Sequence, residues 1–319
     1  MNMNIHRFIV KLMTFASSVF VVLLLMLISG IFIIGCQYEE DYCASLLDKL
    51  QRMKSINEPK IILVGNSNLS FGINSEMIEN AINMPVVNLG LHGGLSNAFH
   101  EDIAKDYIKS GDIVIVCHTT FSDDNRILDP LLAWTTVEYH KDLWKFIRPS
   151  DYYDMLRAFP IYWRKALLSL IFKEDSDGIP YSRKNFNKYG DIRLKPVDKR
   201  AAPGKILWSK DMVIPEVNQT CADRLNKFNK FVKAKGAVML AAAYPIGEGK
   251  YTPPVEKYEG FQKELAEKLD FDVISDYRDY FIPYKYFYNT VLHLDNEGTK
   301  IRTSQLIKDI QNWQKNRKH

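Results

Sequence analysis

A long stretch without charge near the amino terminus constrains the fold of this chain most strongly. From Leu12 to Tyr38 the sequence contains no charged residue, and the run VFVVLLLMLISGIFIIG within it is almost wholly apolar. Such a segment is long enough to cross the roughly 30 Å hydrocarbon core of a bilayer as a helix. A cleaved secretory signal usually has a shorter apolar region of about 7 to 15 residues. The sequence therefore predicts an uncleaved membrane anchor.

The end of this segment leaves a second kind of membrane attachment open. The run IIGC, which ends at Cys36, resembles the lipobox of bacterial lipoproteins, whose cysteine is lipidated after cleavage. We favour the spanning helix because of the length of the segment. Either form of attachment, with a short basic head before it, places the bulk of the chain outside the cytoplasm. His6, Arg7 and Lys11 precede the segment and Glu39, Glu40 and Asp41 follow it, but Lys49, Arg52 and Lys54 also lie near enough to count, in the opposite direction, under the positive-inside rule.

The chain divides into three expected parts. Residues 1–38 form a short cytoplasmic head and the transmembrane anchor, and residues 39–57 form a juxtamembrane helix. Residues 58–319 form one α/β domain, which an insertion at residues 122–215 interrupts.

The overall composition is that of a globular protein and argues against some classes of partner. The chain has 319 residues, of which 46% are hydrophobic and 25% charged, and its net charge is +4. Its basic residues form no stripe over a recognisable nucleic-acid-reading element, so nucleic acid is not an expected partner. The cysteines show no CxxC pair and no histidine at zinc-site spacing, so we expect no metal and no other cofactor. The cysteines are Cys36, Cys43, Cys117 and Cys221.

Short apolar runs alternate with helical patterns, which is typical of a parallel α/β sheet. We therefore expect a three-layer α/β fold with a five-stranded, mostly parallel sheet. The expected strands are Ile61–Val64, Val86–Leu89, Ile113–Cys117, Val238–Ala243 and Phe271–Ile274. The expected helices are Tyr42–Met53, Ser75–Ile82, Asn97–Lys109, Asp223–Lys235, Val255–Leu269 and a last helix from about Asn296.

The insertion has two halves of different character. Its first half is helical and aromatic, and these aromatic side chains could pack on the sheet, stack on sugar rings or lie at a membrane interface. Its second half is basic and aperiodic, which predicts an irregular or mobile loop. The basic run could attract an anionic glycan or a lipid head group, or it could be a solvated loop. Its members are Arg183, Lys184, Lys188, Arg193, Lys195, Lys199 and Arg200.

A polar run follows the first expected strand. In ILVGNSNLSFG, residues 62 to 72, the apolar residues stop at a glycine, and Ser67 then stands between two asparagines. Gly-Asn-Ser-Asn is good turn chemistry in itself. However, the carboxyl edge of an open parallel sheet is where ligands bind, so Ser67 is also a candidate nucleophile.

A hydrolytic serine needs a base that takes its proton, and histidine is the usual one. His293 lies after the last expected strand and before the final helix, which places it at the same sheet edge as Ser67. The other histidines near expected strands are His92, His100 and His118.

These blocks together resemble the SGNH/GDSL hydrolase superfamily. Ser67 follows the first strand, NLGLHGGLS follows the second, and His293 precedes the last helix. The resemblance covers the chain from about residue 58 onward without the insertion, and it implies a flavodoxin-like strand order. It also implies Ser67 as nucleophile and His293 as general base, with the Ser67 amide and the backbone around Gly93 and Gly94 as the oxyanion site. Leu69 argues against the G-x-S-x-G elbow of ordinary α/β-hydrolases.

Two blocks depart from the pattern of that superfamily. Asn66 stands where the first block normally has aspartate, and the third block reads CHTTFSDDN without the usual asparagine donor. His118 or Asn125 could supply the missing donor. We expect Asn66, Asn68 and His118 to contact substrate.

The superfamily normally has a catalytic triad of serine, histidine and an acid, and the acid is also replaced in this chain. The aspartate expected three residues before His293 is Thr290, and Asn289 comes one place earlier. Replacing the triad acid by an amide can lower turnover by around 10⁴ in a serine protease. Asn289 is the expected partner that orients His293, and Asp295 and Asp276 are alternatives.

Two functions remain open from the sequence. Within that superfamily, the pattern is similar to that of membrane-anchored bacterial relatives encoded with envelope polysaccharide and O-acetylation systems. The resemblance implies a serine esterase or O-acyltransferase that acts on an acylated cell-envelope glycan, or on another ester, through an acyl-Ser67 intermediate. The alternative is a catalytically inactive binding or assembly protein with envelope polysaccharide assembly proteins as partners.

Overall fold

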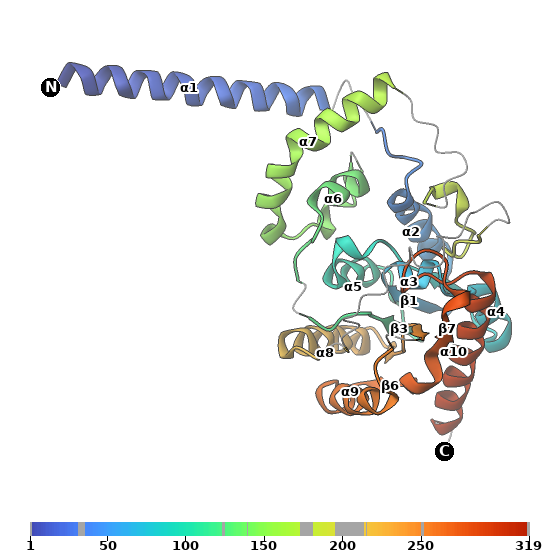
Figure 1. The fold of residues 1–319 in the computed structure, drawn as a ribbon. Coiled ribbons are helices and arrows are strands. Elements are labelled where there is room, and N and C mark those ends of the chain that lie inside the picture. The colour runs from blue at the N-terminus through green and yellow to red at the C-terminus, as the bar shows by residue number, and fades with distance from the viewer. Residues whose placement is uncertain are drawn as a thin grey trace.

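A five-stranded parallel sheet forms the centre of the molecule (Figure 1). The computed structural model describes residues 2–30, 36–122, 125–138, 140–172, 181–194, 214, 216–249 and 252–317. The strand order is β2-β1-β3-β4-β6, and every neighbouring pair is parallel. The five predicted strands are therefore confirmed, and the sheet is wholly parallel. The strands are β1 (Ile61–Gly65), β2 (Val86–Asn88), β3 (Ile113–Cys117), β4 (Val238–Ala241) and β6 (Asp272–Val273).

The central strands are apolar because both faces of the sheet are covered, as is usual for parallel sheets. Successive residues of a strand point to opposite faces. In β1, Ile62 and Val64 join the larger hydrophobic core, whereas Ile61 and Leu63 join a second core on the other face. The strand sequences are thus short apolar runs because both faces of the sheet are buried.

Helices cover the two faces unequally and complete the three layers (Figure 1). The larger core is formed with α2 (Ser45–Ser55), α5 (Asn97–Lys105), α8 (Gln219–Ala234) and α9 (Val255–Lys268). The smaller core is formed with α4 (Ser75–Ile82) and α10 (Asn296–Asn316). Helix α5 ends four residues earlier than predicted, because the chain turns at Asp106 toward β3.

Several short elements were not predicted. A second, two-stranded parallel sheet pairs β5 (Ile246–Glu248) with β7 (Phe281–Pro283). The four-residue helix α3 (Ser67–Ser70) follows β1. The 3-10 turns are η2 (Tyr42–Ala44), η3 (Gly93–Leu95), η4 (Trp144–Phe146), η5 (Pro149–Asp151), η6 (Arg183–Asn185), η7 (Tyr277–Tyr280) and η8 (Tyr284–Tyr286).

The apolar amino terminus forms one long helix, α1 (Asn2–Ser29), which projects away from the domain (Figure 1). Its stretch Ile5–Ser29 is long and apolar enough to cross a membrane, and it is not buried by the rest of the protein. The helix begins earlier in the sequence than the charge-free segment and ends before Cys36. Residues 31–35, which complete the predicted segment, lie outside the described residues.

The first half of the insertion is helical, as predicted. It contains α6 (Pro130–Val137) and α7 (Tyr152–Ile171). Trp134 stacks on Tyr162 with ring centroids 5.2 Å apart, and it also contacts Phe159 and Trp144. Packing therefore accounts for these aromatic side chains, whereas Tyr152 and Tyr153 are exposed.

The second half of the insertion is predicted as an irregular or mobile loop, and its described part is irregular but firmly attached. Residues 181–194 are held to the start of α4 and to β2 through the buried carboxylate of Asp191, and Lys49 of α2 donates to the Gly190 carbonyl at 2.7 Å. This carboxylate accepts hydrogen bonds from Ser75 Oγ at 2.6 Å and from Asn88 Nδ2 at 2.9 Å. Residues 173–180, 195–213 and 215 lie outside the described residues, with Lys195, Lys199 and Arg200 among them.

The basic side chains of this segment have partners within the protein. Arg183 forms a bidentate ion pair with Asp48 at 2.6 and 2.7 Å. Arg193 donates to Asn74 Oδ1 at 2.7 Å. The described part of the basic run is therefore used largely to hold the insertion to the domain.

Candidate active site

The polar run after β1 forms a tight turn that presents Ser67. Gly65 is required there, because a Cβ at this position would lie 2.8 Å from the carbonyl oxygen of Cys117. Asn66 then caps α3, with its Oδ1 accepting from the Asn68 amide at 3.0 Å. Ser67 is the first residue of α3 and is half-buried. The residues that form the turn are thus the same ones that present Ser67.

His293 lies on the loop between η8 and α10. Its backbone is fixed by the amide of Tyr288, which donates to the His293 carbonyl at 2.8 Å, and by its own amide, which donates to Thr290 Oγ1 at 3.1 Å. The imidazole Nε2 lies 2.8 Å from Ser67 Oγ. The structure therefore brings together the two side chains that the sequence placed at one sheet edge, which are 226 residues apart in the chain.

The other imidazole nitrogen meets two polar groups. Asn289 Oδ1 lies 2.9 Å from His293 Nδ1, and the Tyr181 hydroxyl lies 3.2 Å from the same nitrogen. Asn289 Nδ2 donates to the Tyr181 hydroxyl at 2.7 Å. A proton on Nδ1, donated to Asn289, leaves Nε2 free to accept the proton of Ser67. This is the tautomer that a general base needs.

Burial keeps His293 uncharged. Its side chain is 6% exposed, and Phe71 stacks on the ring with centroids 4.2 Å apart. Desolvation, with a smaller contribution from the nearby His92, lowers the pKa of His293 to about 3. The imidazole is therefore neutral across the physiological range, but a positive charge on it is poorly stabilised.

No carboxylate among the described residues hydrogen-bonds to His293. Asp295 caps α10, with its Oδ1 accepting from the amides of Glu297 and Gly298. Asp276 caps η7 and pairs with Arg278. Both alternatives to Asn289 are thus engaged elsewhere.

The two glycines after β2 have different surroundings. The Gly94 amide donates to His92 Nδ1 at 3.0 Å in this structure, so the oxyanion role of the backbone around Gly94 requires this bond to open and stays a prediction. Gly93 lies beside the nucleophile turn, where a Cβ would be 3.8 Å from Asn66 Nδ2. Thr119, just past β3, accepts from Asn66 Nδ2 at 2.8 Å and is half-buried. Because Thr119 Oγ1 accepts this bond, its hydroxyl proton can still be donated in a second hydrogen bond.

Asn68 holds the turn together from inside the protein. Its side chain is fully buried and donates to Asn66 Oδ1 at 2.7 Å and to the Cys117 carbonyl at 3.0 Å. The buried guanidinium of Arg302 donates to the Asn68 carbonyl at 2.7 Å and to its Oδ1 at 2.8 Å. The predicted substrate contact of Asn68 is therefore not supported, because every polar atom of its side chain is used internally.

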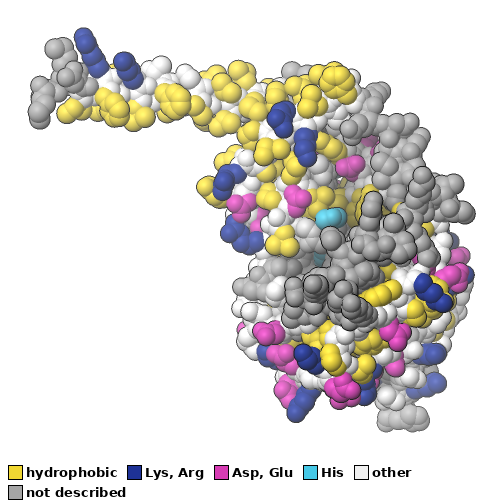
Figure 2. Space-filling view, in the orientation of Figure 1, with side chains coloured by type: hydrophobic (Ala, Val, Ile, Leu, Met, Phe, Trp, Pro, Cys, Tyr) yellow, Lys and Arg dark blue, Asp and Glu magenta, His cyan; other side chains and the backbone are white. Residues whose placement is uncertain are grey.

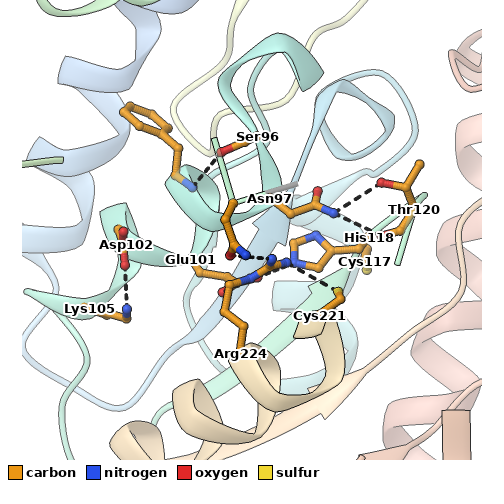
Figure 3. A network of polar contacts seen from close by, with 12 residues as sticks. Ser96, Asn97, Glu101, Asp102, Lys105, Cys117, His118, Thr120, Cys221 and Arg224 are labelled. Atoms are coloured by element: carbon orange, nitrogen blue, oxygen red, sulfur yellow. Dashed lines mark hydrogen bonds and ion pairs between the residues drawn. The ribbon is translucent and has the colours of Figure 1, made fainter. Parts of the chain in front are cut away.

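His118 also belongs to the interior (Figure 3). The ring is fully buried, and its Nε2 lies 3.0 Å from Glu101 Oε1. Arg224 of α8 donates to the same carboxylate at 3.1 Å and to Asn125 Oδ1 at 2.9 Å. This network ties α5, α8 and the end of β3 together, so the structure does not support a substrate contact for His118, and the donor role of Asn125 stays a prediction.

The two other candidate histidines, His100 and His92, differ in burial. His100 is fully buried, and its Nε2 lies 3.2 Å from the His92 carbonyl oxygen. His92 itself is exposed and caps η3. Sequence reasoning thus identified the histidine that contacts Ser67 among the described residues, but it missed Tyr181, Thr119 and Phe71 as neighbours of the site.

No protein-family model matches the chain, and no curated protein is similar to it in sequence.

Proposed function

We propose that the protein is a membrane-anchored serine esterase or O-acyltransferase of the SGNH type. The observation that carries the proposal is the hydrogen-bonded chain from Ser67 through His293 to Asn289, with distances of 2.8 and 2.9 Å. The position of these three hydrogen-bonded residues in the fold supports the same conclusion. Ser67 follows β1, where the strand order of the sheet reverses between β1 and β3, and such switch points are the usual ligand sites of open α/β sheets.

The proposed reaction has two steps. Ser67 Oγ attacks the acyl carbonyl of the ester while its proton passes to His293 Nε2, and the proton then goes to the departing hydroxyl oxygen of the glycan. Water or a second hydroxyl group attacks the acyl-Ser67 ester by the same proton route in reverse, which gives hydrolysis or transfer. The Ser67 amide, the Gly93 amide and the Thr119 hydroxyl are the proposed donors to the oxyanion of each tetrahedral intermediate.

The proposed location is outside the cytoplasm. The helix α1 supports a single membrane crossing, and the basic residues His6, Arg7 and Lys11 at its start favour a cytoplasmic amino terminus. Lipidation at Cys36 would give the same orientation. An acylated cell-envelope glycan is the proposed substrate because of the resemblance in the motifs, and envelope polysaccharide assembly proteins are the proposed partners.

Covalent labelling tests this function directly. We expect the full chain in detergent to react with a fluorophosphonate probe, and peptide mass spectrometry to find the adduct on Ser67. Denatured protein is the control, because its serines lack an organised base. Absence of any adduct on the native chain, or an adduct only on another residue, would overturn the proposal.

The rate of labelling should also have an unusual pH dependence. His293 accepts the Ser67 proton only when it is neutral, and the lowered pKa of about 3 keeps it neutral at higher pH. We therefore expect the rate to stay flat from pH 8 down to about pH 5, where a histidine of ordinary pKa near 6.5 would already be largely protonated. Labelling rates measured across this range in one buffer series check the prediction. A fall of tenfold between pH 7 and pH 5.5, without unfolding, would contradict it.

One observation favours a second function. The side-chain amide of Asn289 lies beside His293, where a catalytic triad would have a carboxylate. An amide stabilises an imidazolium less well than a carboxylate does. A protein that keeps the fold for binding, without turnover, would tolerate that replacement. This alternative predicts that the native chain binds acylated glycan but forms no covalent adduct with the probe.

A further inference from the structure

Helix α7 carries a broad apolar surface that the described part of the protein leaves uncovered. Buried residues such as Phe159 and Tyr162 attach one side of the helix to α6. The other sides expose large apolar side chains along the whole length of the helix. They are Tyr152, Tyr153, Leu156, Ile161, Leu168, Leu170 and Ile171, followed by Phe172. An exposed surface of this kind usually marks an interaction site.

This surface lies next to the end of the membrane-spanning helix. Figure 1 shows the end of α1 beside α7, whose carboxyl end continues past it. Trp163 Nε1 donates to Ser29 Oγ at 2.9 Å, and Met26 packs against the apolar cluster of α7. Figure 2 shows hydrophobic side chains continuing from α1 onto the adjoining end of the domain.

The chain that leaves α1 is also fixed to the insertion. The carboxylate of Glu138, just after α6, accepts from the amides of Gln37 and Tyr38 at 3.2 Å each. The rings of Tyr38 and Tyr162 lie 6.2 Å apart. Helices α1, α6 and α7 therefore form one connected unit, and a bilayer crossed by α1 must lie close to α7.

The charges on α7 suit a lipid surface. Arg157, Arg164 and Lys165 are exposed among the apolar side chains. Long basic side chains can place their stems in the apolar layer and their charged ends among phosphates. Asp154, the acidic residue in the first turn, is paired with Arg126. Aromatic residues such as Tyr152 and Tyr153 are enriched at membrane interfaces.

We propose that α7 lies in the interface of the bilayer that α1 spans, with its exposed apolar side chains among acyl chains and its basic side chains at anionic head groups. The helix then acts as a second membrane contact that fixes the orientation of the α/β domain on the membrane. This inference rests on the proposed membrane anchoring by α1, but not on the proposed chemistry of Ser67.

Spin labels on the full chain test this contact. Leu156→Cys and Ile171→Cys are labelled one at a time in a Cys36→Ser background, because the other native cysteines are buried. The protein is placed in nanodiscs of phosphatidylcholine with phosphatidylglycerol. We expect both labels to be accessible to oxygen and shielded from a water-soluble nickel chelate, which is the signature of the acyl region.

Two reference positions calibrate the measurement. A label at Leu23→Cys reports whether α1 is in the bilayer, and Lys263→Cys on α9, whose side chain is 78% exposed, reports bulk water. Labels on α7 that match Lys263 while Leu23 is in lipid would overturn the proposal. Labels shielded from both oxygen and nickel would also overturn it, because they would show a protein partner or a second copy on this surface. Fluorophosphonate labelling of the same samples shows separately whether the site is active.

Discussion

Replacing Ser67 by alanine is expected to abolish ester turnover, with a loss of about 10³-fold or more in kcat. The Ser67 hydroxyl is the only group of the protein that forms a bond to the acyl carbon in the proposed mechanism. Its loss should leave the fold intact, because among the described residues Ser67 Oγ hydrogen-bonds only to His293, and alanine is well tolerated in the first turn of a helix. Turnover of an acetyl ester by Ser67→Ala and by the unchanged chain measures the effect.

Ser55→Ala is the matched control for this experiment. Ser55 ends α2 and is exposed, and its hydroxyl bonds, within the described part of the chain, only to the Arg52 carbonyl at 2.9 Å, so its replacement should change turnover by less than twofold. Thermal unfolding of both variants within a few degrees of the unchanged chain shows that the fold is kept. If Ser67→Ala retained more than a tenth of the turnover, a directly activated water would have to replace the acyl-serine mechanism.

The sheet was predictable because its strands are buried on both faces. A run such as Ile113–Cys117 is apolar at every position, and its bounds in the structure are those predicted. The weak edge strand β6 was predicted as four residues and forms two, since Phe271 and Ile274 flank the paired part. The small sheet of β5 and β7 was missed because each strand has three residues and little periodicity.

The site was predictable where it follows from sheet topology. Ser67 and His293 were found because the carboxyl ends of parallel strands share one edge. Tyr181 could not be found, since it lies in an irregular segment whose path is set by contacts such as the buried Asp191. His118 and Asn68 were misjudged because a polar residue at a strand end can point inward when buried partners such as Arg302 satisfy it.

Replacing Asn289 by aspartate is expected to increase turnover by about 10² to 10⁴-fold, the reverse of the loss seen when a triad acid becomes an amide. The new carboxylate would lie where Asn289 Oδ1 is now, 2.9 Å from His293 Nδ1. At that distance in a buried site it would stabilise the imidazolium that forms as Ser67 attacks. The Tyr181 hydroxyl, which now accepts from Asn289 Nδ2, can turn its proton toward the carboxylate.

The pH dependence separates this electrostatic effect from a change in packing. A carboxylate raises the pKa of His293 from about 3, so the acid limb of the Asn289→Asp variant should lie at higher pH than that of the unchanged chain. Asn289→Ala is the control, because it removes the hydrogen bond without adding charge and should lower turnover while leaving the acid limb in place. Tyr181→Phe in the Asn289→Asp background should lose part of the gain. An Asn289→Asp variant with unchanged turnover and an unchanged acid limb would show that His293 gains no charge during the reaction, and the general-base role would be refuted.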